Sequence, residues 1–488
     1  MVLCALVAAG ASVASLKRAR DQALPAAVTL TGDSRTIPAS FLGLSVEMGE
    51  LASFTRAGAA LDRVLSLLRT PSGSPILLRV GGRSADETYW NASTADAPRW
   101  VFAPGAEWLA QLGSLVRRDN LRVTLALNVA VHSPLMASEF ARAVLGALPA
   151  GGLAGLAVGN EPDMFRWQTS LDEERVPSTT ASTPLDWARG YSAADYWRDY
   201  RSYARALAAS VPGIPLVGPE ATGLTPGWLA GVAGLGGLAP SSLTVHRYAS
   251  SKCWSQASPA YPSISLLASE RASAGLAAGL RSSIEFAHRR GMSFRVTELN
   301  SVSCGGNAGV ADSFATALWA PDVLFELIRA GVDGTNWHIR ADMVNAPFEV
   351  LAGAIEPRPE LYGLVLFAQM IDPGARLVGV RIVAAGGLHI KAWAVRSPTR
   401  TEVLLVNKGP RAADVSLYCR RTRGRAWIER LLAPSIGATG GVTLGGRTIG
   451  FDGRWHGRGV TASIEPSGGR YRVVLPGYSA ALTVMPAR

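Results

Sequence analysis

The feature that most constrains the fold is a regular alternation, between Phe41 and Arg340, of short apolar runs with longer stretches of helical spacing. Short apolar runs bounded by turn residues are typical of buried strands, and apolar residues at every third or fourth position are typical of helices. Eight strands, each followed by a helical segment or a long loop, predict a (β/α)8 barrel. The predicted strands are Phe41–Met48, Pro75–Gly82, Arg122–Val129, Gly155–Pro162, Pro215–Ala221, Ser242–Ala249, Ser293–Asn300 and Gly334–Arg340.

Periodicity alone also allows a doubly wound sheet, which shows the same alternation of strands and helices. Such a sheet usually carries a glycine-rich phosphate loop after its first strand, and Leu42–Leu51 does not have that pattern. We therefore predict an α/β fold built on a TIM barrel over residues 41–355.

The pattern changes after Pro357, where short strand-like runs are separated by Gly, Pro and Ser turns. These runs predict a C-terminal β-sandwich over residues 356–488. Residues 26–40 contain a further strand-like stretch, which we expect to join that sandwich. The strand-like runs are Leu388–Val395, Thr401–Asn407, Val415–Cys419 and Tyr471–Leu475.

The first residues form an apolar run with the length of a signal-peptide core, and Ser12-Val13-Ala14 offers a small-x-small cleavage site. We therefore predict that residues 1–25 are a signal peptide or N-terminal anchor, that the protein is secreted, and that the mature chain has no stable membrane span. The positive residues that usually open a signal peptide are missing, and a buried first helix is the alternative.

The net charge of +11 would suit a polyanionic partner, but no nucleic-acid-binding motif accompanies it, and we predict no nucleic-acid partner. The four cysteines are too widely spaced for a zinc knuckle. Cys253 and Cys304 both follow strands that are predicted to end on one face, so in an exported protein we expect them to form a disulfide. Two separate buried thiols are the alternative.

Polar side chains gather at the predicted carboxyl ends of the strands, which is the face where barrels of this kind hold their active sites. Strand ends are also polar simply because loops begin there, so each residue by itself is weak evidence. The strand-end residues are Glu47, Arg79, Asn128, Asn160, Glu161, Glu220, His246, Tyr248, Glu298, Asn300, His338 and Arg340.

Two of these residues suggest a reaction. Glu161 lies at the end of the fourth strand and Glu298 ends the seventh, and these strands lie nearly opposite one another across the mouth of a barrel. Hydrolysis of an acetal needs an acid that protonates the leaving oxygen and a carboxylate that stabilises or traps the oxocarbenium-like centre. A spacing of about 5 Å between the carboxyls predicts retention of configuration, and a wider gap predicts inversion.

Asn160-Glu161-Pro162 on the fourth strand and Glu298 on the seventh resemble the retaining glycoside hydrolases of clan A. Longer stretches resemble family 79, which holds β-glucuronidases and heparanases, and the likeness spans nearly the whole chain after residue 25. These stretches are Phe41–Glu47, Leu78–Asp86, Thr297–Ser301, Phe314–Asp322 and Leu404–Lys408.

The resemblance implies that Glu161 is the general acid/base and Glu298 the nucleophile. It implies that Asn160 bonds the 2-hydroxyl of the sugar, that Glu47 accepts hydrogen bonds from other hydroxyls, and that Tyr248 orients the nucleophile. On physical grounds Glu161 needs a raised pKa and Glu298 a lowered one. Arg79 is our candidate for the cation that keeps Glu298 charged, with an internal ion pair of the barrel as the alternative.

The sequence departs from the family around the sugar carboxylate. The loop after the nucleophile commonly reads Gly-Val-Ser-Asp, and here Ala311 replaces its serine; Asn345 stands where a tyrosine usually precedes Ala-Pro-Phe. Arg340 could replace these two donors with a bidentate grip. Alternatively the sugar is a neutral hexose or a modified uronic acid, and Arg340 pairs with Asp342.

We therefore predict a retaining glycoside hydrolase that acts on an oligo- or polysaccharide, with β-glucuronidase activity as the favoured specificity. His246 and His338 are assigned to substrate contact or support, because two glutamates leave no need for a histidine base. We predict no metal and no cofactor. The alternatives are a catalytically silent carbohydrate-binding or surface protein and an endo-glycanase of a neighbouring clan A family.

Overall fold

The computed structural model describes residues 21–91, 101–165, 190–420, 422 and 424–486. The predicted signal peptide lies outside these residues up to position 20. No helix in the described part of the chain combines the length and the apolar character needed to cross a bilayer.

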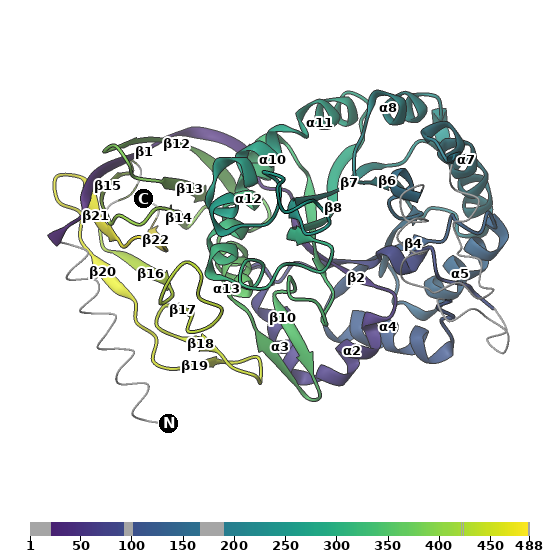
Figure 1. The fold of residues 1–488 in the computed structure, drawn as a ribbon, viewed down its shortest axis with the longest axis horizontal. Helices are drawn as coiled ribbons and strands as arrows, with labels where there is room; N and C mark the ends of the chain where they lie inside the picture. Colours follow the sequence, from purple (N-terminus) through teal and green to yellow (C-terminus); the bar gives the residue numbers. More distant parts are fainter. Residues whose placement is uncertain (1–20, 92–100, 166–189, 421, 423, 487–488) are drawn as a thin grey trace.

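Eight parallel strands close into a barrel in chain order, which confirms the predicted TIM barrel (Figure 1). Most of their residues are buried on both faces, as expected for strands that are lined by side chains inside and covered by helices outside. The strands are β2 (Leu42–Glu47), β3 (Ile76–Gly81), β4 (Leu121–Leu127), β5 (Leu153–Val158), β6 (Leu216–Ala221), β7 (Ser242–Ser251), β8 (Ser293–Ser303) and β9 (Gly334–Ile339).

Helices surround the barrel, and most of the outer ones are amphipathic (Figure 1). In α4, for example, Trp108, Leu112 and Leu115 face inward, and Glu107 and Arg118 complement the dipole at the two helix ends. The helices are α2 (Glu50–Ala57), α3 (Ala59–Leu67), α4 (Ala106–Arg118), α5 (Pro134–Ala147), α7 (Ala193–Ser210), α8 (Pro226–Ala233), α9 (Ile264–Ala268), α10 (Ala274–Ala278), α11 (Arg281–His288), α12 (Phe314–Ala330) and α13 (Pro359–Met370).

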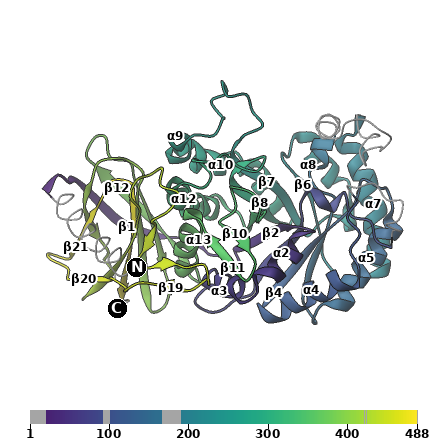
Figure 2. The same ribbon diagram turned by 60° about the horizontal axis from the view of Figure 1, so that its bottom comes forward.

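Two of these helices, α12 and α13, are apolar nearly all round because they lie between the barrel and the C-terminal domain (Figure 2). The sequence-based boundary at residue 355 falls before α13. In the structure α13 packs against α12, and Glu360 on α13 accepts a 2.9 Å hydrogen bond from the indole of Trp337 on β9. The barrel therefore extends to Met370.

The C-terminal domain is one curled sheet of ten strands rather than two separate sheets. Residues from nearly all of its long strands contribute to a single apolar core, so the sheet wraps around that core as a sandwich would. The strands are β1 (Leu24–Thr36), β12 (Arg376–Ala384), β13 (Ile390–Arg396), β14 (Arg400–Asn407), β15 (Ala413–Tyr418), β16 (Ala426–Leu432), β17 (Thr443–Leu444), β20 (Ala462–Ile464), β21 (Arg470–Leu475) and β22 (Ser479–Pro486).

The N-terminal strand β1 belongs to this sheet, where it pairs antiparallel with β12 and parallel with β15. Two small hairpins complete the described strands: β10 (Phe348–Leu351) pairs with β11 (Ala354–Pro357), and β18 (Thr448–Ile449) pairs with β19 (Trp455–His456).

A buried polar contact joins the two domains. Asp322 on α12 accepts a 2.9 Å hydrogen bond from the indole of Trp393 and forms an ion pair with Lys408. Both Asp322 and Lys408 are almost fully buried, so each charge depends on the other for compensation. Two of the stretches quoted in the sequence analysis, Phe314–Asp322 and Leu404–Lys408, therefore meet at this contact.

The strands β7 and β8 are longer than the other barrel strands and stay paired beyond the rim, as far as Ser251 and Ser303. Just past their ends, Cys253 and Cys304 form the predicted disulfide, with their Cα atoms 6.0 Å apart. The prediction is confirmed, and the bond ties together the two loops that follow the strands of His246 and Glu298. Cys419 is free and buried.

Candidate active site

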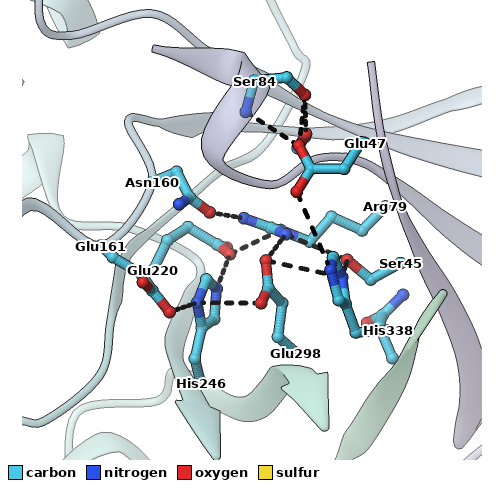
Figure 3. A network of polar contacts seen from close by, with 12 residues as sticks. Ser45, Glu47, Arg79, Ser84, Asn160, Glu161, Glu220, His246, Glu298 and His338 are labelled. Atoms are coloured by element: carbon cyan, nitrogen blue, oxygen red, sulfur yellow. Dashed lines mark hydrogen bonds and ion pairs between the residues drawn. The ribbon is translucent and has the colours of Figure 1, made fainter. Parts of the chain in front are cut away.

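Polar side chains from seven of the eight barrel strands meet at the carboxyl end of the barrel (Figure 3). This is the end where the βα loops of such barrels form active sites. The residues are Ser45 and Glu47 on β2, Arg79 on β3, Asn160 and Glu161 directly after β5, Glu220 on β6, His246 and Tyr248 on β7, Glu298 on β8 and His338 on β9.

Glu298 is buried, and both of its carboxylate oxygens are hydrogen-bonded. Arg79 Nη1 donates to Oε1 at 2.8 Å, and the hydroxyl of Tyr248 donates to Oε2 at 2.9 Å. The rings of His246 and His338 each lie 3.7 Å from the carboxylate. Burial by itself would raise the pKa of Glu298, but attraction from His246, His338 and Arg79 and the bond from Tyr248 hold it well below its ordinary value.

Glu161 begins the turn that follows β5, with a left-handed φ of 45°. Its backbone N–H donates to the carbonyl of Glu220 at 2.9 Å, and its side chain is 22% exposed at the mouth of the barrel. Burial raises the pKa of Glu161, and the negative charge of Glu298 raises it further. A 2.9 Å hydrogen bond to His246 lowers the pKa but does not cancel these effects.

The two glutamates lie close together, and their pKa values are shifted in opposite directions. An oxygen of Glu161, a ring nitrogen of His246 and an oxygen of Glu298 all lie within 4.8 Å of one another. The pKa of Glu161 is shifted up and that of Glu298 is shifted down. One carboxyl is therefore suited to donate a proton and the other to act as an anion, which is the division of roles that acetal hydrolysis requires.

His246 lies between two carboxylates. Its Nδ1 is 2.9 Å from Glu161 Oε1, and its Nε2 is 3.0 Å from Glu220 Oε2. Burial lowers the pKa of His246, but Glu298, Glu161 and Glu220 together raise it to about 9. The ring is therefore an imidazolium at neutral pH, and both of its nitrogens donate.

Arg79 is fully buried and contacts four acceptors at once, one of which is the hydroxyl of Ser45, 3.0 Å from Nη1. Its Nε lies 2.7 Å from Glu220 Oε2, its Nη1 bonds Glu298, and its Nη2 donates to Asn160 Oδ1 at 2.8 Å. The guanidinium thus orients both the anionic Glu298 and the amide that precedes Glu161. Of the two alternatives considered for Arg79, the structure places it as the direct partner of Glu298.

Glu220 connects the two cations, and the sequence analysis gave it no role. Its side chain has no solvent exposure, and Oε2 bonds both Arg79 and His246. Burial raises the pKa of Glu220, but these two cations lower it below the ordinary value. The sequence signal that could have identified Glu220 was its position near the end of a predicted inner strand. Its two partners, Arg79 on β3 and His246 on β7, could not be read from that position.

Glu47, on β2, lies on the side of the network away from Glu161 (Figure 3). The backbone N–H of Ser84 donates to Glu47 Oε2 at 2.9 Å, and the hydroxyl of Ser84 donates to the same oxygen. A Cβ on Gly82 would come within 2.4 Å of the Glu47 carboxyl carbon, and Gly82 has φ of 71°. Glycine is therefore required there for Glu47 to reach the site. Ser84 was also missed by the sequence analysis.

Arg340, which the sequence analysis proposed as the group that binds a sugar carboxylate, lies apart from this network. Arg340 begins the turn after β9; its Nε is 3.9 Å from Asp342 Oδ1, and its side chain is 41% exposed. Asn345 is buried, and its amide donates to the carbonyl of Val302 at 2.7 Å. Asn345 therefore braces the loop after β9 against β8.

Glu161, His246 and Glu298 are also the group of described residues whose geometry could hold a metal ion. A histidine ligand must be neutral. In this site both ring nitrogens of His246 are bonded to carboxylates, and its pKa is raised to about 9. The donor set therefore suits an ion-pair network better than a metal centre.

Comparison with known proteins places this geometry in a familiar architecture. No family model and no curated protein sequence matches the chain. Solved structures do. A 4-O-α-L-rhamnosyl-β-D-glucuronidase from Fusarium oxysporum superimposes with a TM-score of 0.75 and 16% identity, covering 94% of this chain and 99% of that one.

A GH51 arabinofuranosidase from Xanthomonas axonopodis pv. citri superimposes with a TM-score of 0.66 and 14% identity, over 95% of this chain and 100% of that one. A bifunctional glucanase-xylanase from a metagenome library gives a TM-score of 0.60 and 14% identity, over 96% and 99%. At such low identity these similarities establish the shared fold, a barrel joined to a β-rich domain.

Proposed function

We propose that this chain is a retaining glycoside hydrolase that cleaves β-glycosidic bonds of an oligo- or polysaccharide. One observation carries the proposal: Glu161 and Glu298, from strands across the barrel, bring carboxylate oxygens within 4.8 Å of one another. Retaining enzymes hold their two carboxyls about 5–5.5 Å apart, and inverting enzymes about 6.5–9.5 Å. The solved structures that the chain resembles are glycoside hydrolases by name, which supports the reaction class.

In the first step, the Glu298 carboxylate attacks the anomeric carbon while Glu161 gives its proton to the leaving oxygen. Arg79 and Tyr248 hold Glu298 ionised and aimed. His246 occupies Oε1 of Glu161, which leaves Oε2 to carry the transferable proton.

In the second step, a water attacks the glycosyl ester and Glu161 accepts its proton. The electrostatics support this change of role. The charge of Glu298 helps to raise the pKa of Glu161, and that charge disappears when Glu298 becomes an ester. The pKa of Glu161 then falls, and the residue becomes a base when a base is needed.

We propose further that the enzyme resembles family 79 and acts as a β-glucuronidase. The similarity to a rhamnosyl-glucuronidase over nearly the whole chain supports this specificity. The position of Arg340, half-exposed beside Asp342, gives it little support. We also propose that the protein is secreted, because the disulfide between Cys253 and Cys304 is typical of oxidising compartments.

The test is Glu298→Gln, compared with the unaltered chain and with Glu285→Gln, which changes an exposed glutamate on α11. On an aryl β-glycoside we expect kcat/KM to fall more than about a thousandfold for Glu298→Gln, since the covalent route is removed. Glu285→Gln should behave as the unaltered chain. A panel of glucuronide, glucoside, galactoside and xyloside decides the glycone, and activity highest on a neutral sugar rejects the glucuronidase assignment.

The stereochemistry of the product gives an independent check. Proton NMR at early times should show the β-anomer first, and release of the α-anomer would reject the retaining mechanism. A 2-fluoro glycoside should label the chain covalently at Glu298. Saccharide binding without hydrolysis or labelling would instead indicate a carbohydrate-binding protein, and internal cleavage of a polymer would indicate an endo-glycanase.

A further inference from the structure

The C-terminal domain carries a groove that is separate from the active site. It has a volume of about 410 Å³, within the range of small-molecule sites. Most of its wall comes from the sheet, and Pro71 and Gln369 of the barrel close one side. The lining residues from the sheet domain are Arg400, Glu402, Trp427, Glu429, Arg447, Thr461, Leu482 and Val484.

Strand register shows why these side chains share one surface. β16, β22 and β14 are neighbours in the sheet. Trp427 and Glu402 are both paired with Val484, and Glu429 is paired with Leu482. Because paired residues and every second residue along a strand point to the same side, the three strands present one continuous face.

The same face covers the barrel elsewhere. Leu404, Leu431 and Leu482 point to this side of the sheet and join the apolar core shared with the barrel helices. The groove begins where the sheet extends past those helices. There Trp427 and four charged side chains join the aliphatic Leu482 and Val484 on the same face.

Trp427 is the apolar centre of this surface. It lies within a strand, yet it is 44% exposed. An indole offers a flat, electron-rich face, on which ligands with weakly positive C–H bonds can stack. The pyranose ring of a sugar has such a face, with its hydroxyls projecting from the edge.

Charged pairs flank Trp427 and are suited to those hydroxyls. Arg400 Nε lies 3.1 Å from Glu402 Oε2, and Arg447 Nη2 lies 3.6 Å from Glu429 Oε1. The pairs supply donors and acceptors side by side and balance each other's charge, which suits a hydroxyl-rich ligand better than a polyanion such as nucleic acid.

We propose that this groove is a second saccharide-binding site, which holds a pyranose segment of a polysaccharide against Trp427. The proposal rests on the proposed function only in taking a polysaccharide as the substrate. Its binding residues come from β14, β16, β22 and the loop positions Arg447 and Thr461, and they do not overlap with those around Glu298.

The test is affinity electrophoresis of the full chain in native gels that contain arabinoxylan or glucuronoxylan, all in the Glu298→Gln background so that the polymer is not cut. We expect retardation in at least one gel. Trp427→Ala should raise the dissociation constant about fivefold or more, and Trp427→Phe should restore part of the binding because it keeps an aromatic face. Phe451→Ala, which changes another exposed aromatic of the same domain, is the matched control and should match the background chain.

The proposal is overturned if the background chain is not retarded in either gel, or if Trp427→Ala is retarded equally. Hydrolysis of an aryl glycoside by the unaltered chain, measured in parallel, tests the proposed function separately. If the chain hydrolyses the aryl glycoside but shows no Trp427-dependent binding, only the proposed binding groove is rejected. If it shows Trp427-dependent binding but no hydrolysis, only the proposed glycoside hydrolase function is rejected.

Discussion

Replacing Glu220 by glutamine tests whether the buried ion-pair network determines the charge of His246. The change keeps the shape of the side chain and removes one negative charge. Glu298, Glu161 and Glu220 raise the pKa of His246 from 6.5 to about 9, against the opposing effect of burial. Because Glu220 is one of three carboxylates that support the imidazolium, its loss should lower the pKa of His246 by on the order of one unit, or about 1.4 kcal/mol.

The same shift has a consequence for stability. The pKa of His246 is higher in the folded chain than its ordinary value of 6.5, so the imidazolium stabilises the fold. A difference from 6.5 to about 9 corresponds to about 3 kcal/mol, fully present below pH 6.5 and lost as the pH rises to about 9. In Glu220→Gln the loss should be smaller, about 2 kcal/mol, and complete at a lower pH.

The direct assay is a pH titration followed by NMR of chains with labelled histidines, of which the sequence has six. One signal should titrate near pH 9 and move down in Glu220→Gln. Urea unfolding at pH 6.5 and 9 measures the stability difference. Asp86, whose pKa is raised to about 8 by burial, titrates over the same interval in both chains and cancels in the comparison. The reasoning is wrong if the histidines all titrate below pH 8, or if the substitution leaves the highest midpoint unchanged.

Three other predictions follow from contacts described above. Arg79→Lys keeps the charge but loses the planar guanidinium whose separate nitrogens reach Glu220, Glu298 and Asn160, so kcat/KM should fall about a hundredfold with little change in KM; initial rates that match the unaltered enzyme would contradict this role. Replacing both Cys253 and Cys304 by serine opens a loop with a sequence separation of 51 and should cost roughly 2–5 kcal/mol, seen as a lower melting temperature; equal melting temperatures would contradict it. Lys408→Met leaves Asp322 buried with Lys391, 3.8 Å away, as its remaining cation and should cost up to about 3 kcal/mol in urea unfolding at pH 7. Because the pKa of Asp322 is lowered in the fold, this cost should shrink as the pH falls through that pKa, and a cost independent of pH would refute the pairing.

The barrel was predictable because its signals are local. Runs of buried residues and helical spacing follow directly from the sequence, and strand ends place Glu161, His246 and Glu298 on one face without knowledge of distances. The disulfide followed from the same reasoning, since β7 and β8 are neighbours. The predicted boundary leaves α13 outside the barrel, although α13 packs against α12. Because α13 is apolar all round, its periodicity carries no sign of which domain it covers.

Which side chains contact one another in the site was harder to predict from the sequence. Glu220 receives its role from Arg79 and His246, which come from two other strands, and a single sequence does not show such meetings. Arg340 shows a related limit. The sequence analysis placed it at the end of a predicted strand, whereas β9 ends at Ile339 and the chain then turns, with the N–H of Met343 bonded to the carbonyl of Arg340. Strand alternation predicts direction only while the strand continues.

The placement of β1 in the C-terminal sheet has a consequence for synthesis on the ribosome. Thr36 pairs with Arg376, so 340 positions separate partners within one ladder. At a translation rate of about 5–20 residues per second, β1 waits roughly 20–70 s before β12 exists. During that interval an unpaired strand with apolar Val28 and Leu30 is exposed to other chains. Until β12 and β15 have been translated, β1 is therefore an unpaired apolar strand beside the nascent barrel. A chain truncated before residue 376 would keep β1 without either of its partner strands.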